Sequence, residues 1–195
     1  VLHMGAIEMR EYTDKLIEMV GAGQKETPKY EKVCMEVIEK RESKKDRYVD
    51  LANEMLKRVA EEAARRGLML GVENREALEE IPLETDFMFF FRDFPGGTVR
   101  YWHDTGHAQI KHNLGFIDHV LHLESMAEQL AGFHIHDVQF PGRDHCAPGT
   151  DIIDFASLKP LVRPEHIRVF EMSPGLSVDE VKAGVTHLKS IWGEE

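Results

Sequence analysis

The fold is decided by the stretch VRYWHDTGH, which occupies residues 99–107. It opens with branched and aromatic side chains that suit a strand covered on both faces, and it closes on polar residues around a glycine. Asp104 falls at the predicted end of the strand and His107 lies just past Gly106, so both side chains can face one cavity. The stretch therefore predicts a buried strand with functional side chains at its carboxyl end.

Four more segments are predicted as strands, and three of them repeat the polar ending. They span residues 1–4, 68–73, 130–136 and 167–171. Polar endings occur at Glu73, at His134 and at Glu171. Helical patterns lie over residues 8–20, 28–67, 84–93, 115–129, 154–162 and 177–191. Strands that alternate with helices in this way predict βαβ units and one parallel sheet, which is the α/β class.

The strand ends also predict a metal site. The carboxyl ends of parallel strands lie together, which would gather three carboxylates and one imidazole at one point. These side chains belong to Glu73, Asp104, His134 and Glu171. Such a cluster repels itself unless a cation compensates it. Oxygen ligands with one imidazole suit Mn²⁺, Zn²⁺, Co²⁺ or Mg²⁺, so we expect one divalent metal ion here.

Eight of the eleven histidines lie between residues 103 and 145. Five histidines have no acidic strand end beside them, and we interpret them as surface or hydrogen-bonded core residues: His112, His119, His122, His166 and His187. His134 and His136 alternate, so they share a face if the strand continues, and only one of them need bind metal. His145 lies in a turn-rich loop over 142–149, where polar side chains are often functional.

The composition excludes several classes of protein. The 195 residues fit one domain over 1–195, and 24 basic against 35 acidic residues give a net charge of −11. Such a field repels a phosphate backbone and disfavours nucleic acid as a partner. No apolar run approaches the roughly 20 residues of a membrane span. Two cysteines form neither a disulfide framework nor a zinc motif, so we expect a cytoplasmic protein without a membrane partner.

Five motifs, taken in order, resemble the xylose-isomerase-like barrel superfamily, which includes sugar isomerases, epimerases and metal-dependent apurinic endonucleases. They are GVEN at 71–74, DTGH at 104–107, HIHD at 134–137, His145 before Pro148 and Gly149, and VFEMSP at 169–174. The resemblance implies a (β/α)8 TIM barrel, of which this chain would hold about strands 4–8. The first three strands would then lie in roughly 80–100 further residues upstream, since a typical barrel has about 250. The edge at 1–4 would be left unpaired.

The resemblance also implies roles for the strand ends. Glu73, Asp104, His134 and Glu171 match the metal ligands of the epimerase branch, and Glu73 and Glu171 match its acid–base pair. One carboxylate would remove a proton next to a carbonyl, and the other would return it through a cis-enediolate. The implied protein is a divalent-metal-dependent isomerase or epimerase of sugars or sugar phosphates. Its substrate would be a small carbohydrate, and its assembly could be a homo-oligomer.

Four residues are expected to bind substrate. His107 would hydrogen-bond a hydroxyl group and Arg143 would pair with a phosphate or carboxylate, while His145 and His3 complete the set. A nuclease alternative would instead use His3, His107 and His145 as ligands of a three-zinc cluster. Arg143 opposes it, because the nuclease branch has a ligand Asp two residues before His145. A lyase or dehydratase on the same barrel is another alternative, and a non-catalytic barrel that binds a partner is a third.

Overall fold

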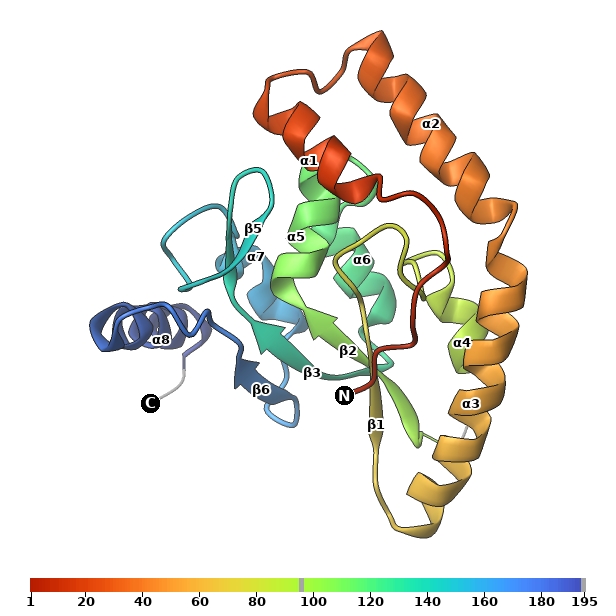
Figure 1. The fold of residues 1–195 in the computed structure, drawn as a ribbon. Helices are drawn as coiled ribbons and strands as arrows, with labels where there is room; N and C mark the ends of the chain where they lie inside the picture. Colours follow the sequence, from red (N-terminus) through yellow and green to blue (C-terminus); the bar gives the residue numbers. More distant parts are fainter. Residues whose placement is uncertain (95–96, 194–195) are drawn as a thin grey trace. The chain divides into compact units, whose positions relative to one another are not determined.

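The structure, a computed structural model, describes residues 1–94 and 97–193. It consists of two compact units, Val1–Tyr101 and Trp102–Glu195. The first unit contains α1 (Thr13–Gly21), α2 (Pro28–Glu42), α3 (Lys45–Arg65), β1 (Leu70–Glu73), α4 (Phe87–Arg92) and the start of β2 (Val99–Asp104) (Figure 1). Strands alternate with helices, so the predicted α/β class is confirmed. No helix in the described ranges is long and apolar enough to cross a membrane.

The second unit contains the end of β2 and the remaining elements. These are α5 (Thr105–Asn113), α6 (His119–Met126), β3 (Leu130–Ile135), β4 (Asp137–Gln139), β5 (Arg143–Cys146), α7 (Phe155–Leu158), the short 3-10 helix η1 (Lys159–Leu161), β6 (Ile167–Phe170) and α8 (Val178–Trp192). β3 lies between β2 and β6 in the sheet, and it pairs with β6 in parallel. β4 and β5 form a separate antiparallel hairpin (Figure 1).

In the first unit the strand predicted over 1–4 is only a bridge. The Leu2 N–H donates to the Gly71 carbonyl at 2.7 Å, and the Glu73 N–H donates to the Leu2 carbonyl at 3.2 Å. Gly5 then adopts a φ of 106°, which turns the chain away from the ladder. On the other side of β1, the Leu70 N–H donates to the Thr98 carbonyl at 2.7 Å, just before β2.

The stretch predicted as helical over 28–67 is confirmed as helical, but it forms two helices, α2 and α3, rather than one. α2 begins at Pro28 after Thr27, whose hydroxyl accepts a hydrogen bond from the Tyr30 N–H at 3.2 Å. The helix ends where residues 40–46 offer no apolar side chain to continue its buried stripe. Near this end the buried Arg41 guanidinium pairs with Asp86 at 2.6 Å, tying α2 to the segment before α4.

The core of the second unit is built on aromatic rings. The Phe133 ring on β3 lies 5.6 Å from the Trp192 ring at the end of α8, measured between centroids. The Trp192 indole N–H donates to the Phe155 carbonyl at 2.8 Å, which satisfies its one polar atom. Burying the apolar faces of these rings fastens α7 and α8 to the sheet that carries the strand ends.

In the second unit the helix predicted over 115–129 is confirmed by α6, whereas α5, which begins directly after β2, was not predicted. Asp104 makes this helix start possible, because its carboxylate accepts the His107 N–H at 2.7 Å and caps the helix. The segment 142–149 was expected to be a loop, yet β5 lies within it and pairs with β4. Local patterns missed the hairpin because its order depends on distant partners.

One buried carboxylate organises the segment that follows β3. Asp137 Oδ1 accepts the N–H groups of Val138 at 2.8 Å and Ile153 at 3.0 Å. Its Oδ2 accepts the N–H groups of Gly149 at 3.0 Å and Asp151 at 3.1 Å. A side chain with two acceptor oxygens therefore satisfies four backbone donors that no strand or helix pairs. The Asp137 carboxylate therefore holds the two ends of the segment 137–153 together.

We expect Asp137→Asn to destabilise the protein by about 3 kcal/mol, since an amide group replaces one acceptor oxygen and faces N–H donors. The free energy of unfolding, measured in urea, checks this value. Asp154→Asn is the matched control, because Asp154 is an exposed helix cap and Asn caps as well as Asp. The control should change stability by less than about 0.5 kcal/mol. Equal effects at both positions would contradict the role of Asp137.

A chain of buried hydrogen bonds links β2 to the hairpin. The Nε2 atoms of His103 and His119 lie 3.0 Å apart, and His119 Nδ1 lies 2.9 Å from Gln109 Oε1. Gln109 Nε2 donates to the side-chain oxygen Oδ1 of Asn113 at 3.0 Å, and Asn113 Nδ2 donates to the Pro141 carbonyl at 2.9 Å. His119 is thus a hydrogen-bonded core residue, as predicted. Its burial lowers its pKa to about 3, helped by the charges of neighbouring histidines.

This histidine makes stability depend on pH. Between pH 6.5 and about 3 the unfolded chain binds a proton that folded His119 does not. Its contribution therefore lowers the free energy of unfolding by about 1.4 kcal/mol for each pH unit of acidification in this window. His119→Phe should give a shallower pH dependence in urea unfolding between pH 7 and 5. His187→Gln, at an exposed histidine, is the control and should keep the wild-type slope.

Candidate metal centre

Asp104 is a fully buried carboxylate at the end of β2. Besides the His107 N–H at 2.7 Å, it faces His136, whose Nε2 lies 3.0 Å from Oδ1 and 3.1 Å from Oδ2. Burial by itself would raise the pKa of Asp104. The charge of His107 and the hydrogen bonds from His136 and the His107 N–H outweigh it and hold the pKa well below its usual range. Asp104 is therefore an anion at neutral pH.

Three of the four predicted metal ligands meet in the second unit. His134 Nδ1 lies 2.8 Å from Glu171 Oε2 and 3.9 Å from Asp104 Oδ2. Their ligand atoms all lie within 4.8 Å of one another. Side-chain exposure rises from 0% at Asp104 through 14% at His134 to 44% at Glu171, so the group is open on the Glu171 side.

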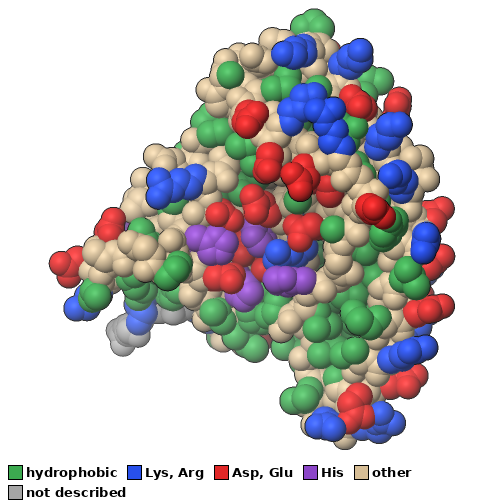
Figure 2. Space-filling model, viewed as in Figure 1, with side chains coloured by type: hydrophobic (Ala, Val, Ile, Leu, Met, Phe, Trp, Pro, Cys, Tyr) green, Lys and Arg blue, Asp and Glu red, His purple; other side chains and the backbone are tan. Residues whose placement is uncertain are grey.

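The sheet sets the positions of these side chains. His134 pairs with Val169 across β3 and β6, and the Glu171 N–H donates to the Ile135 carbonyl at 3.1 Å. The His134 ring meets Trp102 edge-on, with centroids 5.2 Å apart. Figure 2 shows His, Asp and Glu side chains close together on the face of the molecule that is viewed in Figure 1.

This donor set fits a divalent cation. Two carboxylates and one imidazole are the ligands that Mn²⁺, Zn²⁺, Co²⁺ and Mg²⁺ accept. A cation would also offset the charge of the Asp104 anion, which has no exposed surface. The residues that would hold such an ion in this unit are Asp104, His134 and Glu171.

Glu73, the fourth predicted ligand, belongs to the first unit. It ends β1, and its Oε2 lies 2.7 Å from His3 Nε2 and 3.1 Å from an Arg75 guanidinium nitrogen. His3, which is expected to bind substrate, is 57% exposed and also lies 3.0 Å from that nitrogen of Arg75. The carboxylate of Glu73 is thus held by two basic side chains at the strand end.

The other predicted substrate residues lie in α5 and the hairpin. His145 Nδ1 is 2.9 Å from Asp144 Oδ2, and this bond raises the pKa of His145. His107 Nε2 lies 4.0 Å from the same Asp144 oxygen. Arg143 is exposed and donates to Gln139 within the hairpin at 3.4 Å. His107, Asp144 and His145 therefore form one polar group, while Arg143 projects from the hairpin.

Two residues of this region received no role from the sequence. Asp144 holds His145, whose φ of 56° is unusual for a residue with a side chain and marks a constrained turn. His136 stacks on the His145 ring at 4.3 Å and 10° while it bonds Asp104. The alternating histidines of HIHD were the available signal for His136, but its partners are distant in sequence and no local pattern names them.

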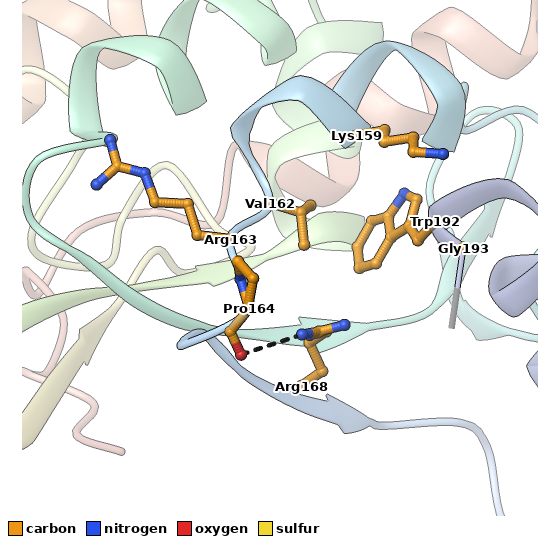
Figure 3. A pocket seen from close by; sticks show the side chains of 7 residues that line it. All are labelled: Lys159, Val162, Arg163, Pro164, Arg168, Trp192 and Gly193. Atoms are coloured by element: carbon orange, nitrogen blue, oxygen red, sulfur yellow. Dashed lines mark hydrogen bonds between the residues drawn. The ribbon is translucent and has the colours of Figure 1, made fainter. Parts of the chain in front are cut away.

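A separate cavity of about 290 Å³ lies between η1, β6 and the end of α8. Figure 3 shows the Trp192 ring between Lys159 and Arg168, with Arg163 further away. Arg168 donates to the Pro164 carbonyl at 3.4 Å. Because its charged lining residues are basic, this cavity is unsuited to a metal cation and is distinct from the group around Asp104.

Comparison with solved structures identifies the fold. No protein-family model matches the sequence, and no curated protein is significantly similar to it. The 3-keto-D-glucoside 4-epimerase of E. coli aligns with a TM-score of 0.60 and 17% identity over 73% of this chain and 54% of its own. A D-tagatose 3-epimerase-like protein aligns with a TM-score of 0.60 and 19% identity over 75% of this chain and 55% of its own.

A D-psicose 3-epimerase is also similar, with a TM-score of 0.56 and 14% identity over 73% of this chain and 55% of its own. This chain has the fold of these sugar epimerases. The resemblance drawn from the motifs is therefore confirmed at the level of the fold. The chain spans about half the length of each of these proteins, which corresponds to part of a barrel.

Gly106 tests the packing of this centre. A Cβ atom at Gly106 would lie 2.0 Å from the His136 ring, so Gly106→Ala must displace the imidazole from Asp104. We expect a loss of about 1–3 kcal/mol in the free energy of unfolding, measured in urea. Gly175→Ala is the control, because its Cβ would meet only Ser173 Oγ at 3.6 Å. If the two variants were equally stable, the close packing of His136 on α5 would be wrong.

Proposed function

We propose that this chain carries the metal-binding part of a divalent-metal-dependent epimerase or isomerase of small carbohydrates. The observation that carries the proposal is the meeting of Asp104, His134 and Glu171 at the ends of three neighbouring strands. The solved structures with this fold that were compared above are sugar epimerases, which supports the same class of reaction.

We include Glu73 as a ligand because of its position in the sequence, at the end of a strand. It ends β1 as Asp104 ends β2, and parallel strands of this fold direct such ends toward the active site. We propose Glu73, Asp104, His134 and Glu171 as the ligands of one divalent ion. A bound divalent ion would stabilise the negative charge that develops on a substrate oxygen as a proton leaves the neighbouring carbon.

Glu73 and Glu171 are the proposed acid and base. A carboxylate can take a proton from the carbon next to a carbonyl, and a second carboxylic acid can return one on the other side of the substrate. Glu171 is suited to this exchange because it is 44% exposed, whereas Asp104 has no exposed surface to offer a substrate. Arg75 and His3 hold the Glu73 carboxylate in place.

The polar group of His107, Asp144 and His145 supports a hydroxylated substrate. Imidazole nitrogens and a carboxylate can donate to and accept from sugar hydroxyl groups at the same time. We propose that His107 and His145 bind hydroxyl groups, with His3 on the Glu73 side. Arg143 would pair with a phosphate or carboxylate when the substrate carries one, because its guanidinium presents several donors.

The proposal predicts that both glutamates are needed for proton transfer. Glu73→Gln and Glu171→Gln should each slow exchange of substrate carbon-bound hydrogen with D₂O by about 10²–10⁴-fold, since neither amide can take up the proton. Exchange is measured by NMR with the purified chain and a panel of small ketoses. The control is Glu165→Gln, an exposed carboxylate that should leave exchange unchanged.

Metal content is measured on the same samples. We expect one divalent ion per chain by elemental analysis, and we expect a chelator to stop exchange until Mn²⁺ or Co²⁺ is restored. Full exchange activity in Glu171→Gln would contradict the acid–base assignment. A metal content approaching three per chain, with cleavage of abasic DNA, would favour the nuclease alternative over the epimerase.

A further inference from the structure

We propose that His136 is a positioning residue, which orients the Asp104 carboxylate so that its Oδ2 faces the metal ligand His134. This inference deepens the proposed function and rests on the metal centre described there. His136 is completely buried, and it has no role among the metal or substrate residues expected from the sequence. Its hydrogen bonds, its packing and its place beside Asp104 carry the argument.

Both ring nitrogens of His136 are occupied by the protein. Nδ1 lies 2.9 Å from the His145 backbone nitrogen, whose N–H can only donate, and 3.3 Å from the Asp137 carbonyl oxygen. The shorter contact makes Nδ1 the acceptor. Nε2 faces the Asp104 carboxylate, which as an anion can only accept, so Nε2 carries the hydrogen and donates. A ring with both nitrogens used in this way has no lone pair for a metal ion. His136 therefore acts on the centre through Asp104.

The ring has little freedom to move. One side lies so close to Gly106 that a Cβ there would be 2.0 Å away, and the other side stacks on the His145 ring at 4.3 Å. Its backbone is tied to Thr105, which accepts the His136 N–H at 3.1 Å and donates to the His136 carbonyl at 2.8 Å. The residue that follows Asp104 thus sets the position of the imidazole that holds Asp104.

The consequence for Asp104 is an unequal use of its oxygens. Oδ1 accepts the His107 N–H at 2.7 Å and lies 3.0 Å from His136 Nε2. Oδ2 lies 3.1 Å from the same nitrogen and is the oxygen that faces His134, at 3.9 Å. The imidazole spans both oxygens and prevents the carboxylate from rotating. Hydrogen-bond partners of this kind commonly change metal affinity by about 10–100-fold.

The test is Co²⁺ binding to the metal-free chain, measured by calorimetry and by the visible absorption of bound Co²⁺. His136→Phe keeps an aromatic ring but removes the donor to Asp104, and we expect its Kd for Co²⁺ to rise by about 10–100-fold with an altered spectrum. His136→Gln keeps an amide N–H that can reach Asp104, so it should recover part of the affinity. Thermal unfolding of each metal-free variant reports whether it folds.

The matched control is Asp154→Ala, which removes a helix cap in the same unit and lowers the midpoint of thermal unfolding. It should bind Co²⁺ like the wild type. Wild-type affinity and spectrum in His136→Phe would overturn the inference while leaving the metal centre intact. Equal losses of Co²⁺ affinity in His136→Phe, His136→Gln and Asp154→Ala would mean that His136 acts only through stability. That result would also overturn the inference. If the wild type takes up no Co²⁺, the metal centre itself fails, and the inference fails with it.

Discussion

Burial of the Asp104 carboxylate is the constraint on which the second unit depends. An unpaired buried charge costs several kcal/mol, so the chain must surround this anion with donors. The first turn of α5 supplies the His107 N–H, and the chain leaving β3 supplies His136. Gly106 must lack a side chain to admit that imidazole. The helix start, the close approach of α5 to the chain after β3, and the proposed metal site all depend on this one carboxylate.

The strands and the chemistry at their ends could be predicted from the sequence because both are local properties. The stretch 99–104 became β2 with the predicted bounds, and β6 covers 167–170 of the predicted 167–171. The helices were harder. Gly106 reads as a turn, yet Asp104 caps a helix that passes through it. The run 28–67 reads as one helix, although a polar interval splits it. At Gly106 the capping carboxylate of Asp104 outweighs the turn signal. In the run 28–67 the lack of apolar side chains in the polar interval ends the first helix.

The candidate site likewise contains residues that local patterns predict and residues that they do not. Asp104, His134 and Glu171 were predictable because each ends a strand, and strand ends of a parallel sheet converge. The roles of His136 and Asp144 were not predictable, since both depend on the β4–β5 hairpin. That hairpin is ordered by Asp137, whose partners lie as far away as Ile153. Hydrogen bonds between backbone and side chain over such a separation leave no periodic signal in a sequence.

The Asp137 carboxylate holds the hairpin segment through backbone groups rather than through the side chains of the hairpin. The groups that bind the Asp137 carboxylate are backbone N–H donors, and they lie at 138, 149, 151 and 153. Position 149 needs glycine, because its φ is 83° and a Cβ there would lie 2.3 Å from the His187 ring. Residues 139–148, which lie between positions 138 and 149, donate no hydrogen bond to the Asp137 carboxylate. Evolution or a designer can exchange the exposed part of this segment, Arg143 included, and thereby alter which molecules are recognised while the sheet beneath is unchanged. The exchangeable part is therefore the exposed side chains of the hairpin, since its backbone also bonds His136 and Asn113.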